Sequence, residues 1–273
     1  MHDSFWSMPG SGTNCAPMNH DDQISEDAVL GGRLRLRQPL RGHRVGHDAI
    51  LLAAAVPARA GQCAADLGAG VGAAALALAF RSPSLKVTLV EIDKRLCSLS
   101  SDNVRLNRLT GRAAVVCADA GSVEALQSAG LAQEGFDQVL MNPPFFDARR
   151  HNVSPDPLRR SAHIGDPDLL NRWIGAASWL LKDGGVLTII WRADGTDEVL
   201  KSLPPAFGGV MALPVLPKPD ASPVRVVVRA VKGGHAAPIF CRPLVLNDDQ
   251  GRPTGPAEAI MRSAEPLDFT KTA

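Results

Sequence analysis

The stretch MNPPFF, residues 141–146, places a group of uncommon residues directly after the apolar run FDQVL. Asn142 offers a side-chain carbonyl oxygen, and the backbone carbonyl of Pro143 offers a second acceptor. The two prolines fix φ at about −65° and carry no backbone N–H, so no donor competes for these acceptors. Phe145 adds a flat apolar face for stacking. Two acceptors that take both hydrogens of an exocyclic amino group return its delocalised lone pair to nitrogen, so the stretch suits a reaction at such a nitrogen.

A second stretch, DLGAGVGA at residues 66–73, has the composition of a ligand-binding loop. It follows an apolar run and precedes the helical pattern AAALALAF. Gly68, Gly70 and Gly72 would let the backbone approach a ligand closely and point its amides outward. We therefore expect this loop to form the core of a cofactor site.

Three acidic residues occur where they could complete that site. Glu91 ends the next apolar run, about 20 residues after Gly70, where a carboxylate can accept hydrogen bonds from both hydroxyls of a ribose. Asp119 ends the run after that and could accept from an adenine amino group. Asp66 immediately precedes the glycines and suits a ligand with a positively charged amino-acid moiety. Together they predict a cofactor that contains adenosine and an amino acid.

The glycine loop leaves two enzyme classes open, because it also fits the G-x-G-x-x-A pattern of a nicotinamide-binding oxidoreductase. Asp66 and a predicted antiparallel pair of strands at one sheet edge disfavour that alternative. With Glu91 and Asp119, the loop resembles the D-x-G-x-G-x-G motif of the class I S-adenosylmethionine-dependent methyltransferases. The resemblance implies S-adenosylmethionine as the cofactor. A cofactor-binding scaffold without activity is disfavoured by the intact Asn-Pro-Pro-Phe.

The MNPPFF stretch in turn resembles the N-P-P-[FY] motif of methyltransferases that act on amino groups. Their targets are adenine N6, guanine N2 of ribosomal RNA, or the glutamine N5 amide of a protein. The resemblance assigns catalysis to Asn142, Pro143 and Phe145, and it also places Asn142 beside the cofactor. The helical substrate domain of the glutamine enzymes and the duplicated domain of some guanine enzymes have no room in this chain.

The segment before the glycine loop, GGRLRLRQPLRGHRVGHDAILLAAAVP, resembles the family that methylates adenine N6 in valine transfer RNA, beside the anticodon. Arg44, Val45, Gly46 and Asp48 match that family, whereas His47 stands where threonine is usual. The match implies that Arg44 and Asp48 belong to the cofactor site. RRSAHIGDPDLLNRW and PVRVVVRAVKG extend the resemblance to about residues 28–262.

Arginines gather on both sides of the proposed site and favour RNA, most simply transfer RNA, as the partner. Exposed arginines can contact phosphates, although alternating RLRLR also fits the solvent face of an ordinary strand. The positive charge is concentrated in these clusters, because the whole chain has a formal charge of only +1. The predicted RNA-binding residues are Arg33, Arg35, Arg37, Arg41, Arg149, Arg150, Arg159 and Arg160.

These motifs require a sheet that brings strand ends together. Five apolar runs alternate with helical segments, which predicts an α/β fold with a doubly wound, mostly parallel sheet. GGVMALPVL and PVRVVVRAVKG would add an antiparallel pair at one edge, for seven strands in all. A short β-hairpin and helix extension would precede this Rossmann-like domain. We expect a disordered lead over residues 1–28, the extension over 29–60, the methyltransferase domain over 61–262 and a tail over 263–273.

The remaining composition predicts an ordinary globular monomer in the cytoplasm. Hydrophobic residues make up 45% of the 273 residues, too many for a disordered chain. No apolar run is long enough to span a bilayer. The five cysteines are widely spaced and favour free thiols in a reducing compartment, and neither they nor the scattered histidines suggest a metal site.

Overall fold

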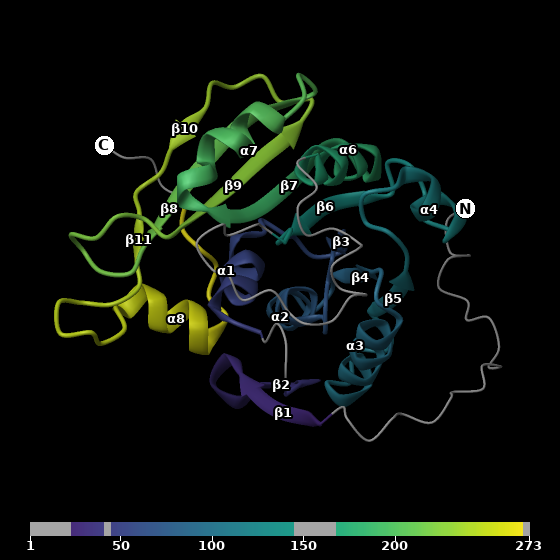
Figure 1. Cartoon of the computed structure of the whole chain (residues 1–273), viewed down its shortest axis with the longest axis horizontal. Coiled ribbons are helices and arrows are strands. Elements are labelled where there is room, and N and C mark those ends of the chain that lie inside the picture. The colour runs from purple at the N-terminus through teal and green to yellow at the C-terminus, as the bar shows by residue number, and fades with distance from the viewer. Residues whose placement is uncertain (1–22, 41–44, 145–167, 270–273) are drawn as a thin grey trace.

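The computed structural model of the chain describes residues 23–40, 45–144 and 168–269. In this part of the chain a sheet of nine strands runs through the molecule, with helices on both faces (Figure 1). Seven of the strands are long enough to form the frame. They are β3 (Cys63–Leu67), β4 (Lys86–Glu91), β5 (Ala113–Cys117), β6 (Phe136–Met141), β7 (Leu181–Arg192), β8 (Phe207–Leu216) and β9 (Arg225–Lys232).

The order of these strands is β5-β4-β3-β6-β7-β9-β8. Strands β3 to β7 pair in parallel, and β9 is antiparallel to both of its neighbours, β7 and β8. The predicted doubly wound sheet with an antiparallel pair at one edge is therefore confirmed. Two further strands, β10 (Ile239–Phe240) and β11 (Leu244–Val245), pair with β8 and were not predicted, because two residues are too few to show a periodic pattern.

Helices cover both faces of the sheet and divide the core into two layers. Alternate strand residues enter different layers, since side chains point to opposite faces along a strand. Leu140 packs with α1 and α2, whereas Val139 and Met141 pack with α6 and α7. The helices are α1 (His47–Ala55), α2 (Ala73–Arg81), α3 (Lys94–Leu106), α4 (Val123–Ser128), α6 (Leu169–Leu180), α7 (Thr196–Ser202) and α8 (Gly255–Ser263), and short 3-10 turns are η2 (Leu30–Gly32) and η3 (Ala193–Gly195). None of the described helices combines the length and apolar character needed to cross a bilayer.

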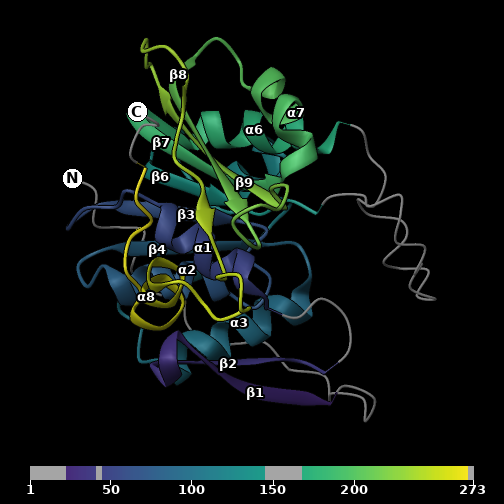
Figure 2. The same cartoon turned by 90° about the vertical axis from the view of Figure 1, so that its left-hand side faces the viewer.

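An N-terminal hairpin of β1 (Ile24–Val29) and β2 (Leu34–Pro39) lies apart from the main sheet, next to α2 and α3 (Figure 2). The expectation of a disordered lead up to residue 28 was wrong over residues 24–28, which belong to β1. The sequence ISEDAV buries no side chain completely, so its hydrophobic pattern is weak. It is a strand because β2 supplies its hydrogen-bonding partner along the full length of both strands.

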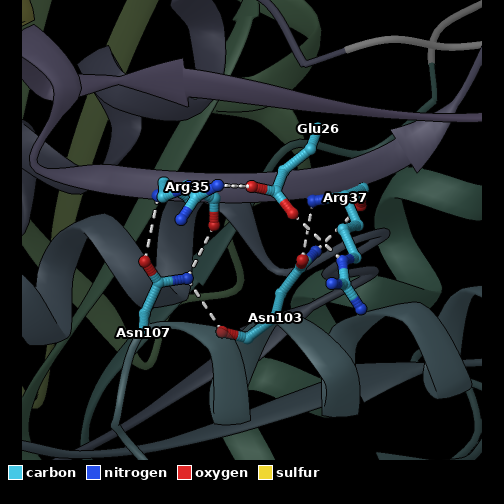
Figure 3. A network of polar contacts seen from close by, with 5 residues as sticks. All are labelled: Glu26, Arg35, Arg37, Asn103 and Asn107. Atoms are coloured by element: carbon cyan, nitrogen blue, oxygen red, sulfur yellow. Dashed lines mark hydrogen bonds and ion pairs between the residues drawn. The ribbon is translucent and has the colours of Figure 1, made fainter.

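Two asparagines one helical turn apart hold this hairpin on α3 (Figure 3). The side-chain amide of Asn107 accepts from the Arg35 amide at 2.9 Å and donates to the Arg35 carbonyl at 2.7 Å. Asn103 makes the same pair of bonds to Arg37, at 2.7 and 2.9 Å. The two amide side chains thus continue the hydrogen bonding of β2 on the edge opposite β1. We call this pair the asparagine clamp.

Two arginines from other elements cap the carboxyl end of α1, which has no basic residue in its last turn. Arg81 donates to the carbonyls of Ala53 and Val56, and Arg229 donates to the carbonyl of Ala55. Burial lowers the pKa of Arg229 to about 10 and also lowers the pKa of Arg81. Positive charges near the carboxyl end of a helix interact favourably with its dipole. Because Arg81 belongs to α2 and Arg229 belongs to β9, these two elements together fix the position of α1.

A disulfide joins Cys97 in α3 to Cys117 at the end of β5. The expectation of free thiols was wrong for this pair, because cysteines 20 residues apart in sequence meet where α3 packs on β5. Cys63 and Cys241 are free. Cys117 is the register neighbour of Glu91, so the bridge lies beside the edge of the sheet that carries the candidate site.

Reduction of this disulfide should lower the free energy of unfolding by about 3 kcal/mol, because it releases a loop of about 20 residues in the unfolded chain. Denaturant unfolding with and without reductant measures the difference, and Cys117→Ser should unfold identically in both. Cys63→Ser is the matched control and should keep the response to reductant. Alkylation of Cys97 and Cys117 in the untreated protein would contradict the disulfide.

Candidate active site at the carboxyl edge of the sheet

The register of the parallel strands brings the predicted site residues to one edge of the sheet. Leu67 of β3 pairs with Val90 of β4 and with Met141 of β6. The residues that follow these partners are therefore neighbours: Gly68 begins the glycine loop, Glu91 ends β4, and Asn142 begins the Asn-Pro-Pro stretch. Ligands of open α/β sheets bind at this edge, where the strand order reverses.

The glycine loop has a conformation that depends on its glycines. Gly68, Gly70 and Gly72 have φ of 69°, 58° and 90°, in the region that other residues rarely adopt. At Gly68 there is also no space, because an added Cβ would lie 2.2 Å from the indole ring of Trp173 in α6. The loop can therefore follow its path only with glycine at this position.

Neighbouring elements hold the loop from outside. The hydroxyl of Ser100 donates to the Gly70 carbonyl at 2.6 Å, and Asn103 donates to the Val71 carbonyl at 2.9 Å. Both residues are on α3, and Asn103 is also half of the asparagine clamp. The hairpin and the glycine loop thus share one fully buried side chain as their support.

Glu91 is buried and its carboxylate accepts three backbone amides. One oxygen accepts from Gly70 at 2.8 Å, and the other accepts from Ile92 and Asp93 at 2.8 and 2.9 Å. The sequence predicted a carboxylate for a ribose and did not predict this bracing of the loop. The oxygen that accepts from Gly70 has a second lone pair for a hydroxyl, so the ribose contact stays a prediction.

Asp119 lies in the turn after β5 and accepts from the Gly121 amide at 2.8 Å. Its other oxygen is 4.0 Å from the Arg172 guanidinium of α6. The indole of the next residue, Trp173, contacts both Gly68 and Gly121. This side chain therefore links the first and third strand ends of the site, and its buried Nε1 has no hydrogen-bond partner among the described residues. The predicted contact of Asp119 with adenine also stays a prediction.

Asp66 lies completely within the protein, below the start of α2. It accepts from the Ala75 amide at 3.0 Å. Burial, and to a smaller extent the charge of Glu91, raises the pKa of Asp66 to about 7, although the Ala75 amide opposes this shift. None of the described residues brings a cation into contact with Asp66. A cationic ligand would therefore stabilise the ionised carboxylate.

The residues singled out by the valine transfer RNA resemblance are only partly described. Asp48 at the start of α1 forms an ion pair with Arg225 at 2.8 Å. Arg225 pairs in register with Arg192, the last residue of β7, so this ion pair lies at the same edge of the sheet. Asn142 is half-buried and Pro143 is buried. Arg44 and Phe145 lie outside the described residues, as do Arg41, Arg149, Arg150, Arg159 and Arg160.

The arginines of β2 occupy the solvent face of the hairpin. Arg33, Arg35 and Arg37 are exposed, and the leucines between them are buried. Arg35 and Arg37 both pair with Glu26 of β1, and this pairing was not predicted. This acid reduces the net positive charge of the face.

One apolar residue at the candidate site, Ile92, was not predicted. Ile92 follows Glu91 directly, and 48% of its surface is exposed. It offers an apolar surface for a planar ring next to the predicted ribose position. Its signal was present in the sequence as an isoleucine between two acids, EID, but nothing in the pattern showed that it would remain exposed.

Comparison with known proteins agrees with this geometry. Residues 43–213 match the family described as methyltransferase small domain. A Bacteroides fragilis protein named tRNA1(Val) (adenine(37)-N6)-methyltransferase is 30% identical over 188 residues, which cover 68% of this chain and 76% of that protein. A Porphyromonas gingivalis protein of the same name is 34% identical over 161 residues, covering 55% of this chain and 59% of its own.

A solved structure shows the same arrangement of elements. It belongs to an Agrobacterium tumefaciens protein described as a predicted O-methyltransferase, with 30% sequence identity and a TM-score of 0.69. The match covers 81% of this chain and 98% of that chain. The family, the fold and the glycine loop together exclude the nicotinamide alternative. The chain belongs to the methyltransferase small domain family and is a class I, Rossmann-like methyltransferase that uses S-adenosylmethionine.

Proposed function

We propose that this enzyme methylates the N6 amino nitrogen of an adenine in transfer RNA. The observation that carries the proposal is the register of β3 with β6, which sets Asn142 beside the glycine loop. The relatives named tRNA1(Val) (adenine(37)-N6)-methyltransferase support the same target. The guanine-N2 and glutamine-N5 alternatives share the Asn-Pro-Pro motif but have no comparable support.

The residues present fit S-adenosylmethionine. Glu91 and Ile92 offer a hydroxyl acceptor and an apolar surface for adenosine, and Asp66 is a buried carboxylate in need of a cation. The loop glycines allow close approach of the backbone. When bound, the cofactor supplies an electrophilic methyl group on a positively charged sulfur.

The protein's own part in the chemistry is to hold the amino group and to localise and orient the lone pair of its nitrogen. Asn142 Oδ1 and the Pro143 carbonyl accept the two N6 hydrogens, so the nitrogen lone pair is directed toward the methyl carbon. The bound cofactor would supply the methyl group, and Asn142 and Pro143 would keep the amino nitrogen oriented toward it. The proton that the nitrogen loses would pass to solvent. Most of the enzyme's rate enhancement comes from orienting the reacting groups and excluding water. No strong base is required.

The finer assignments of partner and location follow from this target. The enzyme acts as a monomer in the cytoplasm, where transfer RNA is present, and Phe145 stacks on the target base. The exposed arginines of β2 contact RNA phosphates. These residues support binding of RNA and carry no information about its sequence.

The decisive experiment is nucleoside mass spectrometry of RNA treated with the purified enzyme and S-adenosylmethionine. Transfer RNA from a strain without the gene should gain N6-methyladenosine. Methylation of guanine or of a ribose hydroxyl would assign one of the other reactions, including the O-methylation suggested by the name of the Agrobacterium protein, and RNA that gains no methyl group would contradict an RNA substrate.

Asn142→Ala should reduce kcat by at least about a hundredfold, because one preorganised acceptor at the reacting amino group is lost. Its affinity for S-adenosylmethionine should stay within a few fold of the parent's. Asn171→Ala is the matched control, because it truncates an exposed asparagine of α6 that lies outside the Asn-Pro-Pro motif and donates to Asp168. Turnover of Asn142→Ala near the parental value would disprove the acceptor pair.

Affinity for S-adenosylmethionine should increase about tenfold from pH 6 to pH 8. The pKa of Asp66 in the free protein is about 7, so the carboxyl group is largely protonated at the lower pH. A cationic cofactor favours the ionised form, and binding at low pH must therefore release a proton. Calorimetry in buffers of different ionisation enthalpy measures both the affinity and the proton. Asp66→Asn should remove the pH dependence, and an equal pH dependence in that variant would refute the assignment.

A further inference from the structure

A pocket rich in arginine lies at the carboxyl ends of α2 and α3. It has a volume of about 360 Å³ and opens between the start of β2 and the turn after α3. Among the described residues, its lining contains Arg33, Arg35, Arg108 and Arg112, together with Phe80 and Asn107, and no acidic side chain. We call it the arginine pocket.

The four arginines differ in the hydrogen bonds and ion pairs that they already form. Arg112 donates to the carbonyls of Ala79, Ser82 and Leu85, so it caps the end of α2. Arg35 pairs with Glu26. Arg33 and Arg108 are exposed and form no ion pair with any residue in the described ranges. These two guanidinium groups remain to bind an anion.

Arg108 occupies a position that would suit a different residue better. It follows the carboxyl cap of α3 with φ of 57°. Glycine or asparagine is the usual residue at that position, and a larger side chain costs roughly 1 kcal/mol there. The chain thus places a long cation at a strained turn beside the pocket, where local stability alone would favour glycine.

Phe80 adds a second kind of binding group. It lies in the last turn of α2, and 37% of its surface is exposed although it is a large apolar residue. A phenyl ring that lines the same pocket as the guanidinium groups offers a stacking face for a base next to sites for phosphates. This pairing of groups fits a nucleotide chain better than it fits a simple anion.

The location separates this pocket from the cofactor site. Helix α2 begins immediately after Gly72, and seven residues separate Ala73 from Phe80, a rise of about 10 Å. Between the pocket and the carboxyl edge, β2 presents Arg35 and Arg37 on the same face as Arg33. Alternate residues of a strand are about 6.7 Å apart, so the three guanidinium groups form a row that can follow a phosphate backbone.

We propose that the arginine pocket binds the backbone of the substrate RNA, with an unpaired base on Phe80, at a distance from the methylated nucleotide. This rests on the proposed function, because it takes the RNA as the substrate. Arg33 and Arg108 contact phosphates, and the row on β2 leads the RNA toward the active site. The asparagine clamp keeps that row in a fixed position relative to the glycine loop.

The test compares two RNAs with the double variant Arg33→Ala/Arg108→Ala. One is full-length transfer RNA, and the other is a short stem-loop that contains the target adenosine. For transfer RNA the variant should raise KM about tenfold and reduce the salt dependence of binding by up to two phosphate contacts. Its KM for the stem-loop should rise less than its KM for transfer RNA, because fewer phosphates of the short RNA reach the pocket. Phe80→Ala should also weaken transfer RNA binding by about tenfold.

A matched control is Arg252→Ala/Arg262→Ala, which removes two exposed arginines outside the arginine pocket, each paired with an acid four residues earlier. It should leave both RNAs unaffected. Melting temperature and S-adenosylmethionine affinity of every variant must match the parent, so that loss of fold is recognised.

Three results would overturn the proposal. The first is a parental KM and salt slope for transfer RNA in Arg33→Ala/Arg108→Ala, and the second is an equal loss of both RNAs. The third is binding of adenosine monophosphate that the variant loses while its transfer RNA binding is unchanged, which would indicate a small-molecule site. Direct binding is measured apart from methylation. A parent that binds transfer RNA without methylating it therefore contradicts the proposed function only, and the salt slope still decides the pocket.

Discussion

The carboxylate of Glu91 is the contact on which the arrangement of the site depends. It is buried and takes three amides, one from the glycine loop and two from the turn that begins α3. A charged acceptor makes stronger hydrogen bonds than a neutral one, and an unpaired buried carboxylate would be costly. The same side chain thus joins two strand ends before any ligand is present. A ribose hydroxyl would add to a bonded network whose geometry is already set.

Support for the glycine loop extends outward from this contact to the N-terminal hairpin. Ser100 and Asn103 hold the loop carbonyls, and Asn103 also holds β2. Trp173 closes the other side against Gly68. The loop is therefore held between α3 and α6, and Asn103 joins the hairpin to the loop. The hairpin's position beside the fold follows from polar contacts as well as from the leucines that it buries.

The sequence predicted the sheet, its antiparallel pair and the edge where the motifs meet, because long apolar runs and glycine patterns report directly on local structure. It predicted a short N-terminal hairpin but not that β1 begins at Ile24, because the polar residues of β1 hide the strand pattern. It could not predict β10 and β11, which are too short. The contacts of Asp48 with Arg225 and of Cys97 with Cys117 join segments distant in the chain. Neither pair has a local signal. Likewise, spacing identified Glu91 as an acid at a strand end. Only the folded structure shows that backbone amides donate hydrogen bonds to its carboxylate.

The asparagine clamp binds only the main chain of β2, through the amides and carbonyls of Arg35 and Arg37. Any residue except proline offers those same groups. The outward side chains of this strand can therefore change during evolution, or in the laboratory, without loss of its anchorage to α3. Residues on a face that contacts a nucleic acid could be substituted to suit a different RNA, while the catalytic framework behind that face stays in place. The constraint falls instead on Asn103 and Asn107, where few other side chains offer a donor and an acceptor in one plane.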